Sequence, residues 1–483
     1  MTHVTSPISR RTLLKAAGVT AGAAGLATAP ATPSLAASGA FAHPGLLHTR
    51  TDLARMAAKV KAGASPYTAG YAKLTANRHA QSGWTANPQA VVYRGAGSPQ
   101  NYATLYNDIH AAYQNALRYH VGGDSAHADT AVAILNAWSA RLTQVAGSAD
   151  RFLAAGLYGY QFANAAELVR GHGDFDLARC QEMLSKVFAP LSDDFLRHHN
   201  HAVVTNYWTN WDLCAMACVL ATGIFCDDKA QVARAVDYFK HGDGLGSIGH
   251  AIPVVYDDGL GEWLEAGRDQ GHALLGVGLM GTFCEMAWNQ GIDLYGYDDS
   301  RFLKGAQYVA KWNLGGQVRY TANTRRKGAI GGWSGTETAS AVAAVDPAMT
   351  RPVWAMIANH YTRRRGLPAT YLTRITAKSA PEGGGGDYGP NSGGYDQLGF
   401  GTLAFTRDRS ADNAQTPTAT PTPTPSASPS PASAGGDLAA TGSGDVVGWA
   451  AAAGVTTLAG GLLLLRRRNR VRGGGTDQAP SPQ

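Results

Sequence analysis

Cysteine is scarce in this chain, which has only five among its 483 residues. These residues form no C-x-x-C pair and are too irregularly spaced for a disulfide framework: Cys180, Cys214, Cys218, Cys226 and Cys284. Cys214 and Cys218 would lie on one face of a helix with apolar neighbours, because side chains four residues apart point the same way. We therefore expect these two to be small core residues rather than metal ligands or a redox pair.

The chain also has few charged residues and only a small excess of positive charge. Charged residues make up 16% of the chain, and the formal net charge is +6. Most of this excess lies near the two ends, in Arg10, Arg11 and Lys15 and in the arginines between residues 466 and 472. The body of the chain is nearly neutral, which argues against nucleic acid as a partner.

Few stretches of the sequence bring together residues that bind metals. His198, His199 and His201 crowd one short segment, with Asp193 and Asp194 just before it. We interpret this segment as a polar helix end; the alternative is a metal site, because the two aspartates lie close enough in sequence to join the histidines. We expect neither a metal nor a cofactor.

The first 37 residues have the features of an export signal. The run Ser9-Arg10-Arg11-Thr12-Leu13-Leu14-Lys15 precedes a mildly apolar Ala/Gly-rich stretch, and Pro33-Ser34-Leu35-Ala36-Ala37 offers a small-residue cleavage site. This order predicts a twin-arginine signal peptide over residues 1–37. The expected partner is the twin-arginine translocase, which exports proteins that are already folded.

The C-terminal residues 438–483 resemble the cell-wall sorting signal of Gram-positive surface proteins. Leu438-Ala439-Ala440-Thr441-Gly442 is followed by an apolar run from Val446 to Leu465 and then by arginines. In such signals a sortase cuts after the threonine, here Thr441, and joins it to peptidoglycan. The alternative is a simple membrane anchor, since about 20 apolar residues span a bilayer with the arginines on the cytoplasmic side.

Residues 411–437 separate this signal from the body of the chain. They are rich in Pro, Thr and Ser, so they cannot bury a core and are expected to form an extended linker through the wall. Together the two ends predict an extracellular protein that is anchored to the cell wall.

The body, residues 38–410, has little of the alternation typical of strands. Segments with a 3.6-residue period dominate, among them 206–224 and 265–289, and short turns containing Gly or Asp join many of them. We predict an all-α domain, an (α/α) toroid or incomplete helical barrel of stacked hairpins. Near its C-terminal end we expect a few short strands or loops: a glycine-rich loop over 382–395 and a short strand over 398–403.

Two segments contain the candidate site residues. Glu265, Arg268, Asp269 and His272 stand at positions i, i+3, i+4 and i+7, so one helix would place them on one stripe, typical of a cleft wall. The alternative is that they are ordinary helix ion pairs and that His272 is an interior histidine with its hydrogen bonds satisfied.

The other segment is Asn206-Tyr207-Trp208-Thr209-Asn210-Trp211-Asp212, in which a helix would place Asn206 and Asn210 one turn apart with Trp208 and Trp211 beside them. Amides, aromatic rings, an arginine and a histidine suit a site that binds a sugar acid.

At this point the chain resembles the alginate lyase superfamily of polyuronate lyases, over most of residues 42–408. Five blocks support the resemblance: His43-Pro44-Gly45-Leu46-Leu47; residues 206–211; residues 265–272; Arg351-Pro352-Val353-Trp354 with Asn359-His360-Tyr361; and the glycine-rich run that ends in Gln397-Leu398-Gly399-Phe400-Gly401. The superfamily fold is an (α/α) toroid.

The resemblance implies β-elimination at a 4-linked hexuronate of the alginate or glucuronan type. The uronate carboxylate is neutralised, a base removes the C5 proton, and an acid protonates the departing O4. Asn206, Asn210 and Arg268 suit the neutralising role. The remaining candidates would bind the substrate: Trp208, Trp211, Trp263, Glu265 and Asp269.

The chain departs from the better-known alginate lyases in two places. No histidine follows the asparagines in residues 206–211, and Leu275 stands where a tyrosine would fall. We therefore expect His272 to be the base. Tyr256 and Tyr361 are the candidates for the acid or for a combined acid and base, since a tyrosine beside an arginine can have a lowered pKa.

Two other functions fit parts of the sequence. An inverting glycoside hydrolase would use two carboxylic acids about 6.5 to 9.5 Å apart, and five are available: Asp257, Asp258, Glu262, Glu265 and Asp269. A wall-anchored glycan-binding protein would use four tryptophans: Trp208, Trp211, Trp263 and Trp333. The hydrolase would not explain the two asparagines or the Arg-His pair. The glycan-binding protein would not need the Arg-His pair.

Overall fold

The computed structural model describes residues 39–95, 100–331, 334–386 and 395–409. Contacts within the chain separate two units, Met1–Thr416 and Pro417–Gln483. The predicted signal peptide, residues 387–394 of the glycine-rich loop, the linker and the sorting signal with its apolar run lie outside the described residues. Within the described ranges, no helix combines the length and apolar character needed to cross a membrane.

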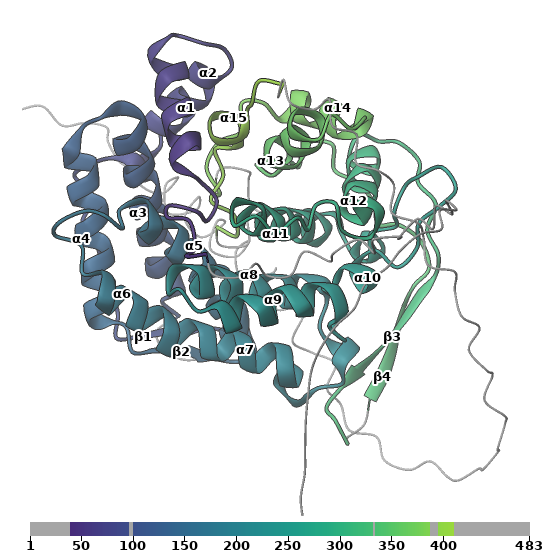
Figure 1. Ribbon diagram of the computed structural model, residues 1–483. Helices are drawn as coiled ribbons and strands as arrows, with labels where there is room; N and C mark the ends of the chain where they lie inside the picture. The colour runs from purple at the N-terminus through teal and green to yellow at the C-terminus, as the bar shows by residue number, and fades with distance from the viewer. Residues whose placement is uncertain (1–38, 96–99, 332–333, 387–394, 410–483) are drawn as a thin grey trace, which may run out of the picture. The chain divides into compact units, whose positions relative to one another are not determined.

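The first unit is built mainly from helices that follow one another in pairs (Figure 1). The inner helices each contact the next along the chain: α3 (Tyr102–Gly122), α5 (Asp150–Leu168), α8 (Thr209–Phe225), α11 (Gln270–Asn289) and α13 (Trp354–Asn359). The outer helices pack against them: α4 (Ser125–Arg141), α7 (Ala189–His198), α9 (Lys229–His241), α12 (Tyr297–Asn313) and α14 (Thr370–Ser379). α6 (Leu177–Met183) packs against α4. The predicted all-α toroid is confirmed.

Three of the inner helices, α5, α8 and α11, are buried on nearly all sides, which explains why their sequences are mostly apolar all round. Every residue of α8 except Trp211 is buried. The inner helices also pack closely: a Cβ atom on Gly156 of α5 would lie 2.5 Å from Cys214 Sγ, and one on Gly159 would lie 2.4 Å from Cys218 Sγ. Both cysteines are free and buried, so the prediction that they are small core residues is confirmed.

The described strands form two small sheets. β1 (Val91–Arg94) pairs in parallel with β2 (Gln144–Gly147), and β3 (Asn323–Gly328) pairs with β4 (Ser334–Ala339) in an antiparallel hairpin. The strand predicted over 398–403 is wrong: helix α15 (Gly401–Phe405) begins there, after Phe400 in a left-handed conformation with φ 58°. Short turns complete the fold: η1 (Arg78–Ala80), η2 (Leu184–Phe188), η3 (His199–His201), η4 (Val204–Asn206), α10 (Ile248–Ala251), η5 (Leu264–Gly267) and η6 (His360–Arg364).

The beginning and the end of the described unit lie side by side. α1 (Arg50–Lys61) and α2 (Tyr67–Thr75) contact α15, as Figure 1 shows. Asp52 of α1 is buried and accepts from Arg55 at 2.5 Å and from Arg407 at 2.6 Å. Burial raises the pKa of Asp52, but the charges of Arg407 and Arg55 outweigh it and hold that pKa well below its usual range.

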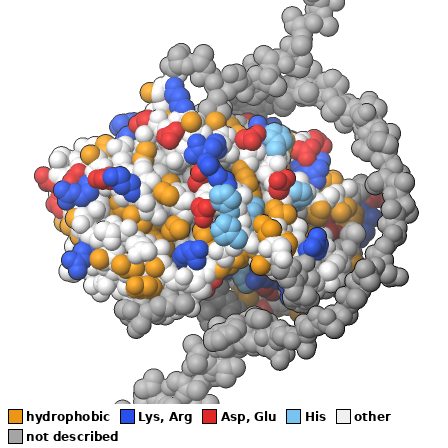
Figure 2. Space-filling view, turned by 90° about the horizontal axis from the view of Figure 1, so that it is seen from below, with side chains coloured by type: hydrophobic (Ala, Val, Ile, Leu, Met, Phe, Trp, Pro, Cys, Tyr) orange, Lys and Arg blue, Asp and Glu red, His pale blue; other side chains and the backbone are white. Residues whose placement is uncertain are grey.

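The surface carries charges of both signs. In the face shown in Figure 2, basic, acidic and histidine side chains are interspersed over the described part of the surface. The histidines that crowd residues 198–201 make different contacts: His198 pairs with Asp194 at 2.8 Å, whereas His199 is buried 3.1 Å from Asp212. Across the described ranges, no three His, Cys, Asp or Glu side chains are grouped so that they could hold a metal ion.

Candidate active site

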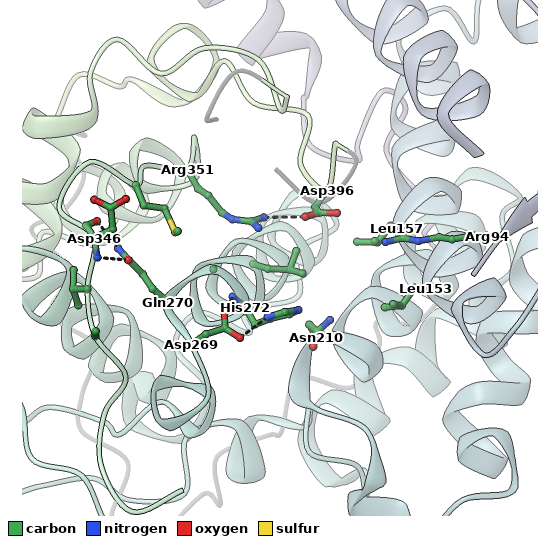
Figure 3. A pocket seen from close by; sticks show the side chains of 15 residues that line it. Arg94, Leu153, Leu157, Asn210, Asp269, Gln270, His272, Asp346, Arg351 and Asp396 are labelled. Atoms are coloured by element: carbon green, nitrogen blue, oxygen red, sulfur yellow. Dashed lines mark hydrogen bonds and ion pairs between the residues drawn. The ribbon is translucent and has the colours of Figure 1, made fainter. Parts of the chain in front are cut away.

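A cavity of about 770 Å³ opens where α11 begins (Figure 3). The start of α11, the first turn of α8 and one side of α5 contribute to its wall, and so do the end of β1, residues 344–351 and Asp396. Three of the residues singled out in the sequence line the cavity: Asn210, Asp269 and His272. A fourth, Arg268, contacts His272.

Asp269 determines where α11 starts. It is the N-cap residue, in an extended conformation, and its Oδ1 accepts from the backbone N–H of His272 at 2.8 Å. The predicted continuous helix from Glu265 is therefore wrong: Glu265 lies in the separate turn η5, and Arg268 lies between η5 and the cap. The four charged side chains still converge, but through a cap and a turn rather than along one helical stripe.

Asp269 also orients the imidazole of His272. Its Oδ2 lies 2.7 Å from His272 Nδ1, and the imidazole points toward Asn210 in Figure 3. Burial raises the pKa of Asp269, but the hydrogen bond and charge of His272, with a smaller contribution from Arg268, lower it to about 2. An ionised Asp269 accepts a hydrogen bond from the Nδ1–H of His272, so the other ring nitrogen, Nε2, carries the free electron pair and can act as a base. The His272 side chain is 40% exposed, so a ligand can reach it.

Arg268 connects this pair to a buried carboxylate. Its Nη2 lies 3.2 Å from His272 Nε2, and its Nη1 lies 3.0 Å from Glu265 Oε1. Glu265 is fully buried and also accepts from the hydroxyl of Thr209 on α8. Burial raises the pKa of Glu265, and Arg268 opposes that shift. Glu265 therefore positions Arg268 against α8, and it does not reach the cavity as a substrate-binding residue would.

The two asparagines have different surroundings. The expected helix from Asn206 is wrong, because Tyr207 and Trp208 are extended and α8 begins only at Thr209. Asn210, in the first turn of α8, lines the cavity, is 3% exposed, and has an Oδ1 with no hydrogen-bond partner among the described residues. Asn206 instead accepts from the backbone N–H of Gly328 at 2.8 Å, so it holds the β3–β4 hairpin.

None of the three predicted tryptophans that the structure describes lines the cavity. Trp263 is fully buried, and Trp211 packs on Phe195 and Tyr207 with ring centroids 5.6 and 4.5 Å apart. Trp208 is nearly buried and packs against the guanidinium of Arg268, whose Cζ is 5.4 Å from the ring centroid. These rings therefore support the site from behind, and Trp333 lies outside the described residues.

The two candidate tyrosines also lie away from the cavity lining. Tyr361 is fully buried and donates to the carbonyl of Tyr295 at 3.0 Å, and burial raises its pKa. Tyr256 donates to Glu262, and burial together with that carboxylate raises its pKa despite the nearby Arg319. The expected lowering of the pKa is wrong for both, and their placement argues against proton transfer to a bound sugar.

The structure adds residues that the sequence did not single out for the site. Arg351 is buried in an ion pair with Asp396 at 3.0 Å, which fixes the end of the glycine-rich segment against the cavity. Gln270 accepts from the backbone N–H of Asp346 at 2.7 Å and so fixes the opposite wall. Arg351 stood within a block of the family resemblance, whereas Arg94 at the end of β1 gave no signal in the sequence.

A cavity in a helical toroid that gathers an arginine, an amide and a carboxylate-oriented histidine is typical of an enzyme whose substrate carries a carboxylate. The alginate lyase family model matches residues 55–318, which is more than half of the chain. The chain belongs to the alginate lyase family, and it is therefore a polysaccharide lyase.

Several solved structures are similar to this chain. An alginate lyase from Bacteroides ovatus is 14% identical over 54% of this chain and 82% of that one, with a TM-score of 0.38. Alginate lyase A1-III from Sphingomonas species A1 is 16% identical over 54% and 76%, with a TM-score of 0.40. A histidine-to-alanine variant of A1-III in complex with a tetrasaccharide is 13% identical over 74% and 95%, with a TM-score of 0.44. No curated protein matches the chain in sequence.

Proposed function

We propose that this protein cleaves a 4-linked polyuronate of the alginate or glucuronan type by β-elimination. The observation that supports the proposal is the cluster of Asp269, His272 and Arg268 at a cavity lined by Asn210. The family match supplies the reaction class, and the side chains at the cavity suit each chemical step.

The first step is neutralisation of the uronate carboxylate. The C5 proton is too weakly acidic to be removed while the adjacent carboxylate carries a full negative charge. Arg268 offers a guanidinium beside His272, and Asn210, in the first turn of α8, offers the N–H groups of its side-chain amide, whose Oδ1 is buried. Both donate to the charge that grows on the carboxylate as the proton leaves.

His272 then acts as the base. Because Nδ1 donates to Asp269, Nε2 holds the free electron pair, and Arg268 Nη2 donates to it at 3.2 Å. A uronate carboxylate competes for that guanidinium and so frees Nε2. The C5 proton moves to Nε2, the C5 electron pair forms the C4–C5 double bond, and the C4–O4 bond breaks. The imidazolium formed is the proton source for the departing O4.

The placement of the carboxylates argues against an inverting hydrolase. Glu262 is buried under the hydroxyl of Tyr256, and Glu265 is fully buried beneath Arg268. Asp257 is exposed and pairs with Arg319. Of the five acids available to that reaction, only Asp269 lines the cavity, and it is already the partner of His272.

Elimination and hydrolysis differ in their products. Digestion of alginate, glucuronan, hyaluronan and pectate should give an increase in ultraviolet absorbance with at least one polyuronate, because each cut creates one unsaturated sugar end. In heavy-oxygen water the products should contain no solvent oxygen, as mass spectrometry can show. Saturated products that carry the heavy oxygen at the new reducing end would instead identify a hydrolase.

We also propose that the protein is exported by the twin-arginine translocase and attached to peptidoglycan by a sortase at Thr441. The support is the order of twin arginines, Pro/Thr/Ser-rich linker, Leu438-to-Gly442 motif, apolar run and arginines in the sequence. Thr441→Ala should move the protein from the covalently bound wall fraction into the membrane or the medium, as judged by detergent extraction. A Thr441→Ala protein that still resists extraction would contradict sortase attachment.

A further inference from the structure

The β3–β4 hairpin contains one buried charge. Arg325 of β3 is 8% exposed, whereas its neighbours Arg326 and Lys327 are exposed. A two-stranded hairpin on a helical domain gains little from burying a guanidinium, because desolvation of a charge is costly unless its partners are well placed. The contacts of Arg325 therefore matter, because they show which segment the buried guanidinium binds.

Arg325 binds the segment that leads into α8. Its Nη1 donates to the carbonyl of Thr205 at 3.0 Å and also to the carbonyl of Asn206. Backbone and side-chain bonds attach the rest of β3 to the same segment: Thr205 Oγ1 donates to the Arg326 carbonyl at 2.7 Å, and the Gly328 N–H donates to Asn206 Oδ1 at 2.8 Å. The hairpin therefore fixes the chain just before Trp208 and Asn210.

Arg325 and Arg268 share one aromatic ring. The Cζ atom of Arg325 is 4.1 Å from the Trp208 ring centroid, and that of Arg268 is 5.4 Å from it. A guanidinium is attracted to the face of such a ring, so the orientation of Trp208 affects where Arg268 rests. By fixing the backbone before Trp208 and covering its ring, Arg325 limits the movement of Arg268.

The residues on either side of the hairpin bind the turn η5, which comes just before Arg268. Before β3, Tyr320 donates to the carbonyl of Leu264 at 3.3 Å, and after β4 the Ala343 N–H donates to the carbonyl of Ala266 at 2.8 Å. A Cβ atom on Gly267 would lie 2.1 Å from the Tyr320 hydroxyl, so the turn η5 fits closely against this flank. Residues 320–343 therefore contact both the turn before Arg268 and the segment before Asn210.

Glu337 offsets the repulsion between the positive charges of Arg325 and Arg268. It stands opposite Arg325 in the hairpin and pairs with its Nη2 at 2.5 Å. Burial lowers the pKa of Arg325, the charge of Arg268 lowers it slightly further, and Glu337 opposes both. Without Glu337, Arg325 would lose its own ion pair, and the acids left beside the two guanidiniums would be Glu265 and Asp269, which pair with Arg268.

From these contacts we propose that Arg325 is a positioning residue, which acts through Trp208 to hold Arg268 where it receives the uronate carboxylate. Through Arg325, the β3–β4 hairpin supports the site although it contributes no side chain to the cavity lining. This inference rests on the proposed function, because it assigns Arg268 to the substrate carboxylate.

The test compares Arg325→Ala with Arg326→Ala, which removes the same charge from the next, exposed position of β3. Arg325→Ala should lower kcat by about 10- to 100-fold, the usual effect of losing a group that orients a ligand-binding residue, and should change KM less. Arg325→Lys should restore only part of the rate, since an ammonium lacks the planar fork. Arg326→Ala should stay near the parent.

A double-mutant cycle separates positioning from general structural damage. In an Arg268→Lys background, Arg325→Ala should lower kcat much less than it does in the parent, because Arg325 acts through Arg268. An equal fold loss in both backgrounds would overturn the proposal. If Arg325→Ala does not fold, Glu337→Gln should give a smaller loss with the same dependence on Arg268, and an equal loss in both backgrounds would again overturn it.

A second measurement does not depend on activity. In Arg325→Ala the Arg268 guanidinium should react faster with phenylglyoxal, mapped by peptide mass spectrometry, than in Arg326→Ala. Equal modification rates would overturn the positioning role even if the parent produces unsaturated sugars. A parent that produces none on any polyuronate, while Arg268 becomes more reactive in Arg325→Ala, would contradict the proposed function but support the influence of Arg325 on Arg268 through Trp208.

Discussion

His272→Ala should lower kcat by about 10²- to 10⁴-fold, which is the usual contribution of a general base. The variant should remain folded, because the cap of α11 uses the backbone N–H of residue 272 and not its side chain. Initial rates of ultraviolet absorbance increase on the preferred polyuronate, together with thermal unfolding followed by circular dichroism, would measure both effects. A variant that keeps most of the parental rate would place the base elsewhere.

Asp269→Asn provides a matched control for the role of the Asp-His pair. Asparagine caps helices about as well as aspartate, so α11 should start at the same residue. With its oxygen used by the cap, the amide would present an N–H to His272 Nδ1, and the proton would then sit on Nε2, which can no longer act as a base. We expect a loss of at least about 10²-fold in kcat with an unchanged thermal midpoint. Parental activity would show that Asp269 only caps the helix.

The second large effect is expected for Asn210. Asn210→Ala should lower kcat/KM by about 10²- to 10³-fold, as for the loss of one donor to a developing negative charge. Asn210→Asp should be at least as damaging, because it places a carboxylate of similar shape where the uronate carboxylate binds. The same rate assay applies, with substrate concentration varied to separate kcat from KM.

Asn206→Ala serves as the contrast, since the sequence presented both asparagines as equivalent. The substitution removes one hydrogen bond from the Gly328 N–H, which should cost about 1 kcal/mol of stability. The decrease in rate should be smaller than for Asn210→Ala. If the two variants lose activity equally, both amides contact the substrate and the placement of Asn206 at the hairpin does not represent the working enzyme.

The existence of the helices could be predicted, but where two of them begin could not. α8 and α11 stand out in the sequence as long apolar segments because these helices are buried on nearly all sides. Their first residues depend on other interactions. Asp269 could have been recognised as a capping residue, whereas Asn206 is kept out of α8 by bonds to a hairpin more than 100 positions later in the chain, which no local pattern contains.

The site could be predicted where its residues are neighbours in the chain. Arg268, Asp269 and His272 are close in sequence, and any turn or helix would keep them together. The ion pair of Arg351 with Asp396 depends on how distant segments meet. The roles of the aromatic residues were the least predictable. A tryptophan can stack on a bound sugar or fill the core, and the sequence pattern is the same in both cases. Only its burial in the structure distinguishes the two roles, as it does for Trp263.

The meeting of the two ends of the domain has a consequence for how the chain folds. Neighbouring helical hairpins such as α3 and α4 can pair as soon as they are synthesised, because their contacts are local. The bond from Arg55 to the carbonyl of Ala404 joins residues 349 positions apart, and Asp52 gains its second arginine only from residue 407. Ring closure must therefore wait for the last residues of the domain, and a chain cut before Arg407 would retain a buried carboxylate with only one of its two cations.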